Sequence, residues 1–429
     1  MATWTPSGTL KDVPFFTHGE GVYLYDEKGK DYVDLTSQAV CANLGHTVPE
    51  SVKTAISDQL DSLPFIYSGL ANCEARARLS SLLSELCPGD ITGFQFPSSG
   101  GEANEAAIRI ARRFTGRTKI FNHYRSYHGG TTASLAATGD FRRLMGEAGG
   151  PGGFVKMMGP CPWHYSHGET DDEASDRSLA MLQDQIMMEG PQTVAAIMME
   201  GVLGAGGVYR YPTKYVQGVR ALCDKHGILL IMDEVMSGFG RSGKMWGHQH
   251  YEGVVPDIMT SAKGLSSSIL PLAMVGVRTD IKQHFDSISS GWGSTYHAHP
   301  VAMACAYACL KHMLDTDLLG HVEKMGVVME EEIERLVAEH PSVARGRSYG
   351  LFACVDLVDK NGDAVQNLVG PPAPAAGAFK AALREQGVFN LLRLPLVHIA
   401  PPLVITEPEL RNATQRLSAA LRDSFDKEC

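Results

Sequence analysis

The chain has 429 residues, of which 44% are hydrophobic, and its formal net charge is −10. This length allows about two or three domains with buried cores, and the apolar content excludes general disorder. The negative charge disfavours nucleic acid or an anionic membrane as the main partner, and no apolar run reaches the ~18 residues of a membrane helix.

The N-terminus and the cysteines indicate the compartment. Residues Met1–Pro6 contain neither a basic region nor an apolar stretch, so we expect no secretory signal. The nine cysteines are scattered and form no Cys-x-x-Cys pair, which favours reduced thiols. We therefore expect a cytoplasmic protein.

The first predicted element is a β-ribbon. Gly21–Tyr25 and Lys30–Leu35 flank the turn Asp26–Gly29. A helix should follow from about Pro49, because apolar residues there recur on one helical stripe. We assign residues 1–60 to an N-terminal segment that packs with a small C-terminal domain.

From about residue 90 to residue 310, strand-like and helix-like patterns alternate. The expected strands are Gly93–Phe96, Lys119–Phe121, Thr193–Met199, Ile228–Asp233, Ile258–Ala262 and Leu272–Val277. Short apolar strands separated by helices, such as Tyr215–His226, indicate a mainly parallel sheet covered on both faces. We assign residues 61–310 to this large α/β domain and interpret the glycine-rich Gly146–Gly153 as a mobile loop within it.

After residue 310 the pattern changes to a smaller α+β domain, which we place at residues 311–429. Its expected elements are a helix over Leu318–Ala338, a strand over Leu351–Asp356, a helix over Ala378–Gln386 and a strand over Val397–Ala400. A last helix should begin at Thr406, which has capping-box spacing to Glu409.

A lysine and an aspartate each follow a predicted buried strand. Lys263 comes after Ile258–Ala262, and Asp233 ends the run Ile228–Asp233. This pair fits pyridoxal phosphate chemistry, in which a lysine forms a Schiff base with the cofactor and an aspartate keeps the pyridinium nitrogen protonated. Most lysines are solvated surface charges. The surrounding motifs must therefore decide whether Lys263 is such a charge or a cofactor-binding residue.

Two further segments could complete such a site. Ser98 or Ser99 would cap a helix, and Gly100 and Gly101 at its start would let the backbone approach a phosphate. Tyr127 follows another predicted strand, where an aromatic ring can stack on a planar cofactor. The alternative for the first segment is a capped helix without a ligand, and the alternative for Tyr127 is an aromatic residue of the core or the cavity rim.

Other motifs are less convincing. Ser237–Met245 matches Gly-x-Gly-x-x-Gly and nearly matches a P-loop, but its first glycine does not directly follow a strand, and Met245 replaces the Ser or Thr that holds Mg²⁺. The histidine pairs His248/His250 and His297/His299 lack acidic or cysteine partners at ligand spacing, so we expect no metal.

With these parts assembled, the chain resembles the class-III pyridoxal-phosphate aminotransferases of fold type I, from Gly21 to its end. The strongest match is Ile231–Gly243, followed by Ala262-Lys263-Gly264. The resemblance implies an α/β fold in which helices enclose a mainly parallel mixed sheet, plus a small α+β domain. It also implies pyridoxal 5'-phosphate as the cofactor.

The resemblance implies a role for each matching residue. Lys263 would carry the cofactor and shuttle protons, Asp233 would pair with the ring nitrogen, and Val235 and Tyr127 would pack on opposite ring faces. The other expected cofactor contacts are Gly100, Gly101, His128, Glu200 and Thr295. Thr295 would reach the phosphate of a partner subunit, so we expect a homodimer or a dimer of dimers with shared active sites.

Four positions bear on phosphate and substrate binding. Gly101 stands where the family usually has Ser or Thr, so one hydroxyl contact to the phosphate should be absent. Arg393 lies in a segment where many ω-aminotransferases carry a carboxylate-binding arginine. Val40 and Tyr67 fall where the family's pocket walls usually lie.

The resemblance implies transamination between an ω-amino acid or amine, such as β-alanine, taurine or 4-aminobutyrate, and a 2-oxo acid, such as pyruvate or 2-oxoglutarate. Both partners would be small molecules, with no nucleic acid and no membrane. The alternatives are an aminomutase or a decarboxylating transaminase on the same fold, or a non-catalytic protein that binds the cofactor.

Overall fold

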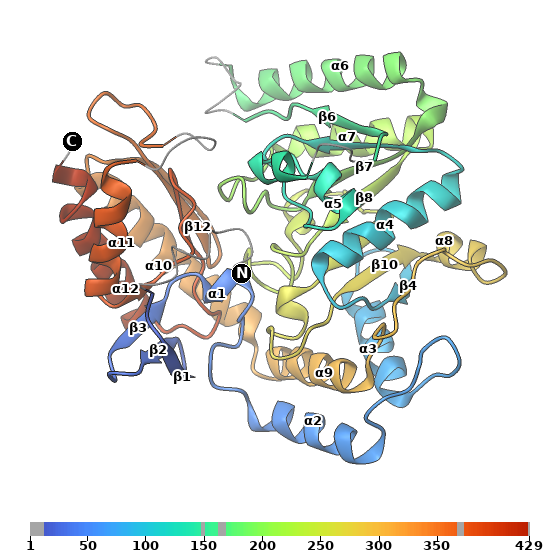
Figure 1. The fold of residues 1–429 in the computed structure, drawn as a ribbon. Coiled ribbons are helices and arrows are strands. Elements are labelled where there is room, and N and C mark those ends of the chain that lie inside the picture. The colour runs from blue at the N-terminus through green and yellow to red at the C-terminus, as the bar shows by residue number, and fades with distance from the viewer. Residues whose placement is uncertain (1–12, 147–150, 162–168, 367–372, 428–429) are drawn as a thin grey trace.

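A seven-stranded sheet lies at the centre of the computed structural model, which describes residues 13–146, 151–161, 169–366 and 373–427. The strand order is β4-β10-β9-β8-β7-β5-β6 (Figure 1). The strands are β4 (Ile91–Gln95), β5 (Lys119–His123), β6 (Phe154–Met157), β7 (Val194–Glu200), β8 (Leu229–Asp233), β9 (Ile258–Ser261) and β10 (Met274–Arg278). β10 is antiparallel to both of its neighbours, whereas the pairings from β9 through β6 are parallel.

Helices bury both faces of this sheet. In β8, Leu229 and Ile231 share a hydrophobic cluster with α4 (Gly100–Thr115). Leu230 and Met232 point the other way and share a cluster with residues of α6 (Asp171–Glu189) and α7 (Thr213–His226). Because both faces are buried, the strand is apolar at successive positions and not at alternate ones.

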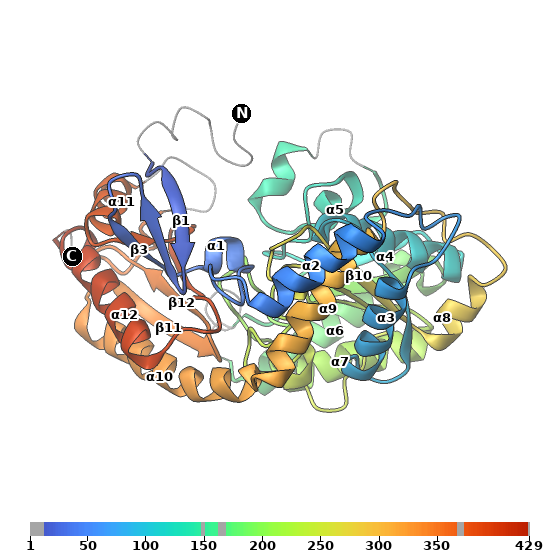
Figure 2. The ribbon, with the colours of Figure 1, turned by 90° about the horizontal axis from the view of Figure 1, so that it is seen from below.

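Further helices and turns surround the sheet. They are α1 (Ser37–Val40), α2 (Glu50–Ser62), α3 (Glu74–Leu86), α5 (Thr132–Ala137), α8 (Thr279–His284) and α9 (Pro300–Asp315), with 3-10 turns η2 (Phe141–Met145), η3 (Pro191–Thr193), η4 (Gly247–His250) and η5 (Lys263–Leu265). α2 and α3 pack against α9, at the lower edge of Figure 1 (see also Figure 2). Among the described residues, no helix is both long and apolar enough to cross a bilayer.

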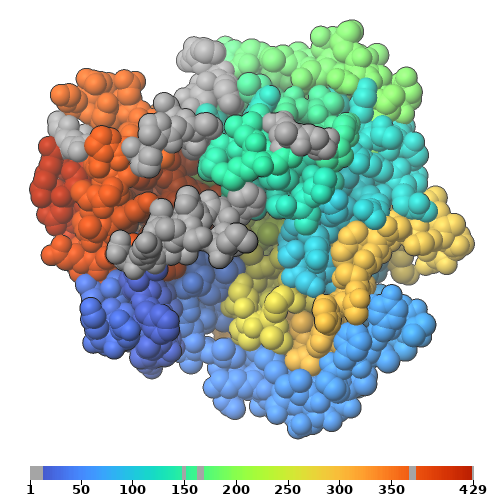
Figure 3. Space-filling view, in the orientation of Figure 1, coloured from blue at the N-terminus to red at the C-terminus, as the bar shows by residue number. Residues whose placement is uncertain are grey.

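The N-terminal ribbon and the C-terminal part share a second sheet. β1 (Phe16–Glu20), β2 (Tyr23–Asp26) and β3 (Asp31–Asp34) continue into β13 (Val388–Phe389), which pairs in parallel with β3. A third sheet contains β11 (Val343–Tyr349), β12 (Phe352–Leu357) and β14 (Leu396–Ile399). Helices α10 (Leu318–Glu339), α11 (Ala375–Glu385) and α12 (Glu407–Arg422) and the turn η6 (Phe425–Lys427) complete this part, orange and red in Figure 3.

The predicted α/β class with a mainly parallel sheet is confirmed. The predicted strands and helices agree with the observed ones to within a few residues, and the capping box of Thr406 and Glu409 is present. Ser99 is the residue that caps α4. Part of the predicted loop Gly146–Gly153, residues 147–150, lies outside the described residues.

The sequence analysis did not predict β1, β6, β11 or β13. Each of these strands lies at the edge of its sheet. β1 and β11 are also mostly polar, and every residue of β1 and all residues of β11 except Val343 are at least partly exposed. Edge strands contact the core on one side only, so they lack the apolar run by which a buried strand is recognised.

Candidate active site

A cavity of about 560 Å³ lies at the carboxyl ends of β7, β8 and β9, beside the start of α4. Ligands of open α/β sheets bind at this edge. The predicted site residues that line it are Lys263, Asp233, Gly100, Gly101, Tyr127, His128, Glu200, Val235 and Arg393. The fold therefore brings together residues that the chain spreads over nearly 300 positions.

Lys263 lies just past the end of β9. Its backbone φ is +31°, a conformation that is costly for a residue with a side chain and is typical of strained functional positions. Burial lowers the pKa of the Lys263 ammonium to about 8. More of this amine is therefore neutral near neutral pH than in an exposed lysine, and the neutral form can act as a nucleophile or a base.

Asp233 ends β8 and is held by three hydrogen bonds. Its Oδ2 accepts from Asn104 Nδ2 and from His128 Nδ1, both at 2.7 Å. Its Oδ1 accepts from the backbone N–H of Val235 at 2.9 Å. Since a carboxylate only accepts, Nδ1 is the protonated nitrogen of His128 in this contact. The carboxylate is fixed in orientation and almost fully buried.

Asn104 was not identified from the sequence, although a signal was present. It is a buried polar residue on the otherwise apolar face of α4. Its Nδ2 also donates to the backbone oxygen of His128 at 2.6 Å, and its Oδ1 accepts from the hydroxyl of Thr260 at 2.6 Å. Asn104 thus ties α4, β9 and the segment of His128 to one carboxylate, that of Asp233.

The backbone at the start of α4 forms a tight cradle. A Cβ added to Gly100 would lie 2.9 Å from Val235 Cγ1. A Cβ on Gly129, whose φ is +137°, would lie 2.6 Å from the Cα of Gly101. Side chains are therefore excluded where these segments meet, and the free N–H groups of a helix N-terminus remain accessible to an anion. The residues present fit the phosphate of the expected cofactor.

Glu200 and Tyr127 form one wall of the cavity. The backbone N–H groups of Tyr127 and Gly204 donate to the two carboxyl oxygens of Glu200 at 2.9 and 2.8 Å. Burial raises the pKa of Glu200 to about 7, and the nearby charge of Asp233 also raises it. Glu200 therefore holds the backbone of Tyr127 at the cavity edge.

Arg142, on η2, lines the cavity and was missed in the sequence analysis. Its guanidinium carbon lies 3.4 Å from the centroid of the Tyr127 ring, and its Nε donates to Asp140 Oδ2 at 2.9 Å. The sequence has two adjacent arginines here, Arg142 and Arg143, and the local pattern does not indicate which of them turns inward.

Three predicted site residues lie outside the lining of this cavity. Thr295 is exposed, and Tyr67 is 45% exposed. Val40 is buried in a cluster with Val202 and Phe352, while its neighbour Ala39 faces the cavity. Their roles stay predictions, and that of Thr295 requires a second chain.

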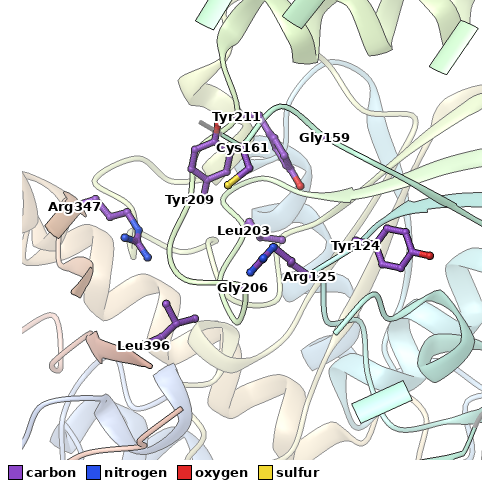
Figure 4. A pocket seen from close by; sticks show the side chains of 10 residues that line it. All are labelled: Tyr124, Arg125, Gly159, Cys161, Leu203, Gly206, Tyr209, Tyr211, Arg347 and Leu396. Atoms are coloured by element: carbon purple, nitrogen blue, oxygen red, sulfur yellow. The ribbon is translucent and has the colours of Figure 1, made fainter. Parts of the chain in front are cut away.

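A second, smaller cavity is shown in Figure 4. Its volume is about 20 Å³, which is room for roughly one water molecule and excludes a substrate. Tyr209 and Arg347 are among its lining residues. Within the described part of the chain, no group of three or more His, Cys, Asp or Glu could hold a metal ion.

Comparison with known proteins agrees with this geometry. Residues 7–421 match the family model described as aminotransferase class-III. The probable gamma-aminobutyrate transaminase 4 of Oryza sativa subsp. japonica is 32% identical over 425 residues, which are 95% of this chain and 86% of that protein.

Solved structures are similar over almost the whole chain. A taurine:2-oxoglutarate aminotransferase from Bifidobacterium kashiwanohense, in complex with PLP and glutamate, has a TM-score of 0.95 and 36% identity, covering 100% of this chain and 96% of that one. An (S)-enantioselective omega-transaminase from Thermomicrobium roseum has a TM-score of 0.92 and 34% identity, covering 99% and 96%.

Proposed function

The chain belongs to the class-III aminotransferases, which use pyridoxal phosphate, and we propose that it transfers the amino group of an ω-amino acid or amine to a 2-oxo acid. One observation carries this proposal. Lys263, the buried Asp233 and the glycine cradle of α4 line a single cavity at the carboxyl edge of the sheet.

The bound cofactor supplies an electron sink for the substrate carbon that carries the amine. Lys263, whose pKa is lowered by burial, takes a proton from that carbon and returns it elsewhere. Asp233 offers a buried carboxylate, and such a group favours a proton on a nitrogen placed against it. Val235 and Tyr127 line the cavity, where they would hold a flat ring between them.

An acidic group on the substrates is supported by Arg393. Its side chain lines the cavity, and guanidinium groups bind carboxylates and other oxyanions with paired hydrogen bonds. Two of the relatives named above are a probable gamma-aminobutyrate transaminase and a taurine:2-oxoglutarate aminotransferase, and both gamma-aminobutyrate and taurine carry an acid group. We propose β-alanine, taurine or 4-aminobutyrate as donors, and pyruvate or 2-oxoglutarate as acceptors.

We further propose a homodimer or a dimer of dimers, with Thr295 completing the phosphate site of the partner subunit. Support comes from exposed apolar side chains near the segment of Thr295. Leu70 is 87% exposed and Tyr296 is 66% exposed, and the rings of Tyr296 and Phe65 contact each other at a centroid distance of 6.4 Å. Apolar surface of this kind favours an interface.

We also propose a cytoplasmic location. The cysteines among the described residues are free thiols, and Cys87, Cys223 and Cys354 are buried. Reduced cysteines are usual in proteins of reducing compartments.

A matrix of donors and acceptors tests the proposed reaction. Purified protein loaded with cofactor should convert β-alanine, taurine or 4-aminobutyrate only when a 2-oxo acid is present, and alanine or glutamate should form in equal amount. Lys263→Ala is the inactive control. Product formed without an acceptor would support an aminomutase, and release of carbon dioxide would support a decarboxylating transaminase. No product with any pair, from protein that holds cofactor, would support a non-catalytic role.

A further inference from the structure

The loop between α8 and α9, residues 285–299, runs beside α4 and is attached on both sides of Thr295 (Figure 1). On its C-terminal side, His297 Nε2 accepts from the backbone N–H of Phe96 at 3.0 Å. The backbone N–H of Ala298 donates to the oxygen of Phe96 at 2.8 Å. Burial lowers the pKa of His297 to about 4, so its ring is neutral and able to accept the first of these bonds.

Two arginines of α4 hold the N-terminal side of the loop. Arg109 Nη1 donates to the backbone oxygen of Gly291 at 2.6 Å, and Arg113 Nε donates to the backbone oxygen of Ser289 at 3.1 Å. Gly291 has a φ of +76°, and a Cβ added there would lie 3.2 Å from Arg113 Cδ. The loop therefore lies closely against the arginine side chains, in a backbone conformation that favours glycine.

The ordinary role of such arginines is different. Arg109 and Arg113 are exposed, and arginines toward the end of a helix are usually solvated charges that complement the helix dipole. Fixing such a long side chain costs conformational entropy. These two, one helical turn apart on the same face, both bond to backbone oxygens of one loop. They therefore fix the path of the backbone that leads to Thr295.

We propose that Arg109 and Arg113 are positioning residues for the cofactor phosphate of the partner subunit, because they hold the loop that presents Thr295. This inference rests on the proposed function, which assigns Thr295 to that phosphate. The same helix begins with Gly100 and Gly101, in the cradle for the phosphate of its own chain. In a symmetric dimer, each α4 thus serves two phosphates, one through its backbone N–H groups and one through its arginines.

A double-mutant cycle tests whether the arginines act through Thr295. Arg109→Ala/Arg113→Ala should weaken the affinity of the apoenzyme for pyridoxal phosphate about two- to tenfold, measured by equilibrium titration. Arg109→Lys keeps a donor and should retain more affinity than Arg109→Ala. In a Thr295→Ala background the arginine substitutions should cause no further loss, because the contact that they serve is already absent. An equal loss in both backgrounds would overturn the proposal.

Arg112→Ala is the matched control. Arg112 lies on the same helix, and its Nε donates at 2.7 Å to the backbone oxygen of Thr118, which precedes β5 and is not part of the loop. The control should therefore lower resistance to urea and leave the cofactor affinity at the wild-type value. A loss of affinity as large as that of the double variant would show that any loosening of α4 suffices, against the proposed role.

Mixed dimers test whether the arginines act across the subunit boundary. One chain carries Lys263→Ala and the other carries Arg109→Ala/Arg113→Ala, so only the second chain gives the absorbance band of lysine-bound cofactor. Its site receives Thr295 from the first chain, whose arginines are intact, and should bind with wild-type affinity. Affinity as weak as in dimers of the double variant alone, after demonstrated exchange, would mean that the arginines act within their own chain and would refute the proposal.

Failure of this inference is distinguishable from failure of the proposed function. A wild type that transfers no amino group, but shows the effect across the boundary, would contradict the proposed reaction alone. Thr295→Ala with wild-type cofactor affinity would overturn the proposed role of Thr295 and this inference with it. An active wild type in which Thr295→Ala weakens cofactor binding, and the arginine substitutions do not, would overturn this inference alone.

Discussion

Replacing Asn104 with Ala should slow the amino-transfer half-reaction while the cofactor still binds. The substitution removes two hydrogen bonds from Asn104 Nδ2, one to Asp233 at 2.7 Å and one to the backbone oxygen of His128 at 2.6 Å. It also leaves the hydroxyl of Thr260 without its partner. Asp233 keeps its bonds to His128 and Val235 but loses the contact that fixes it to α4.

The expected size of each effect follows from the usual energies of hydrogen bonds. A hydrogen bond to a charged group contributes about 1.5–3 kcal/mol, so a carboxylate freed to rotate should slow the half-reaction about ten- to a hundredfold. Unpaired buried groups at His128 and Thr260 should lower the free energy of unfolding by about 1–3 kcal/mol. Thr260→Val removes only the hydrogen bond between Thr260 and Asn104, which does not touch Asp233. Its effect on the rate should therefore be smaller than that of Asn104→Ala.

Stopped-flow absorbance of the cofactor, mixed with the best donor, measures the half-reaction in one turnover, and urea unfolding measures stability. Asn122→Ala is the control, because Asn122 is also fully buried and hydrogen-bonded but lies on β5 and does not line the cavity. If Asn104→Ala loses stability as Asn122→Ala does but keeps the wild-type rate, Asn104 does not position Asp233.

Three further predictions concern the cofactor. Asp233→Asn should fold and bind some cofactor, yet slow the half-reaction by several orders of magnitude, because an amide does not stabilise the ring-nitrogen proton; near-normal turnover would contradict this role. Only the neutral amine attacks an aldehyde, and burial lowers the pKa of Lys263 to about 8. The rate of cofactor uptake by the apoenzyme should therefore rise up to about pH 8 and then level off. For an exposed lysine, this rate would keep rising to about pH 10. Thr295→Ala should weaken cofactor retention about ten- to a hundredfold, and dimers mixed from Thr295→Ala and Lys263→Ala chains should regain full-strength binding in about half of their sites if Thr295 acts across the interface. No recovery in such dimers would assign Thr295 to its own chain or to no phosphate contact.

The buried strands were predictable because apolar side chains cover both of their faces. β8 is apolar at successive positions since both of its faces pack against helices. β1 and β11 were not predictable from such a pattern, because as edge strands they are largely polar. Lys263 and Asp233 were identified from their place at the ends of apolar strands, which is a local property of the chain.

The remaining features of the site depend on tertiary structure. Asn104 could have been suspected from its apolar neighbours, but its partner Asp233 lies 129 positions away. The inward turn of Arg142 depends on Asp140 and on the Tyr127 ring. Val40 turns into a hydrophobic cluster because the short α1 contains non-helical residues, a kink that the local sequence pattern does not predict.

Covalent mapping of the cofactor tests directly whether Lys263 carries it. Wild-type protein loaded with pyridoxal phosphate is reduced with borohydride, digested and analysed by peptide mass spectrometry. We expect a pyridoxyl group on the peptide that contains Lys263, and none on the corresponding peptide of Lys263→Ala. A pyridoxyl group on another lysine of the wild type, or no stable label at all, would contradict this role of Lys263.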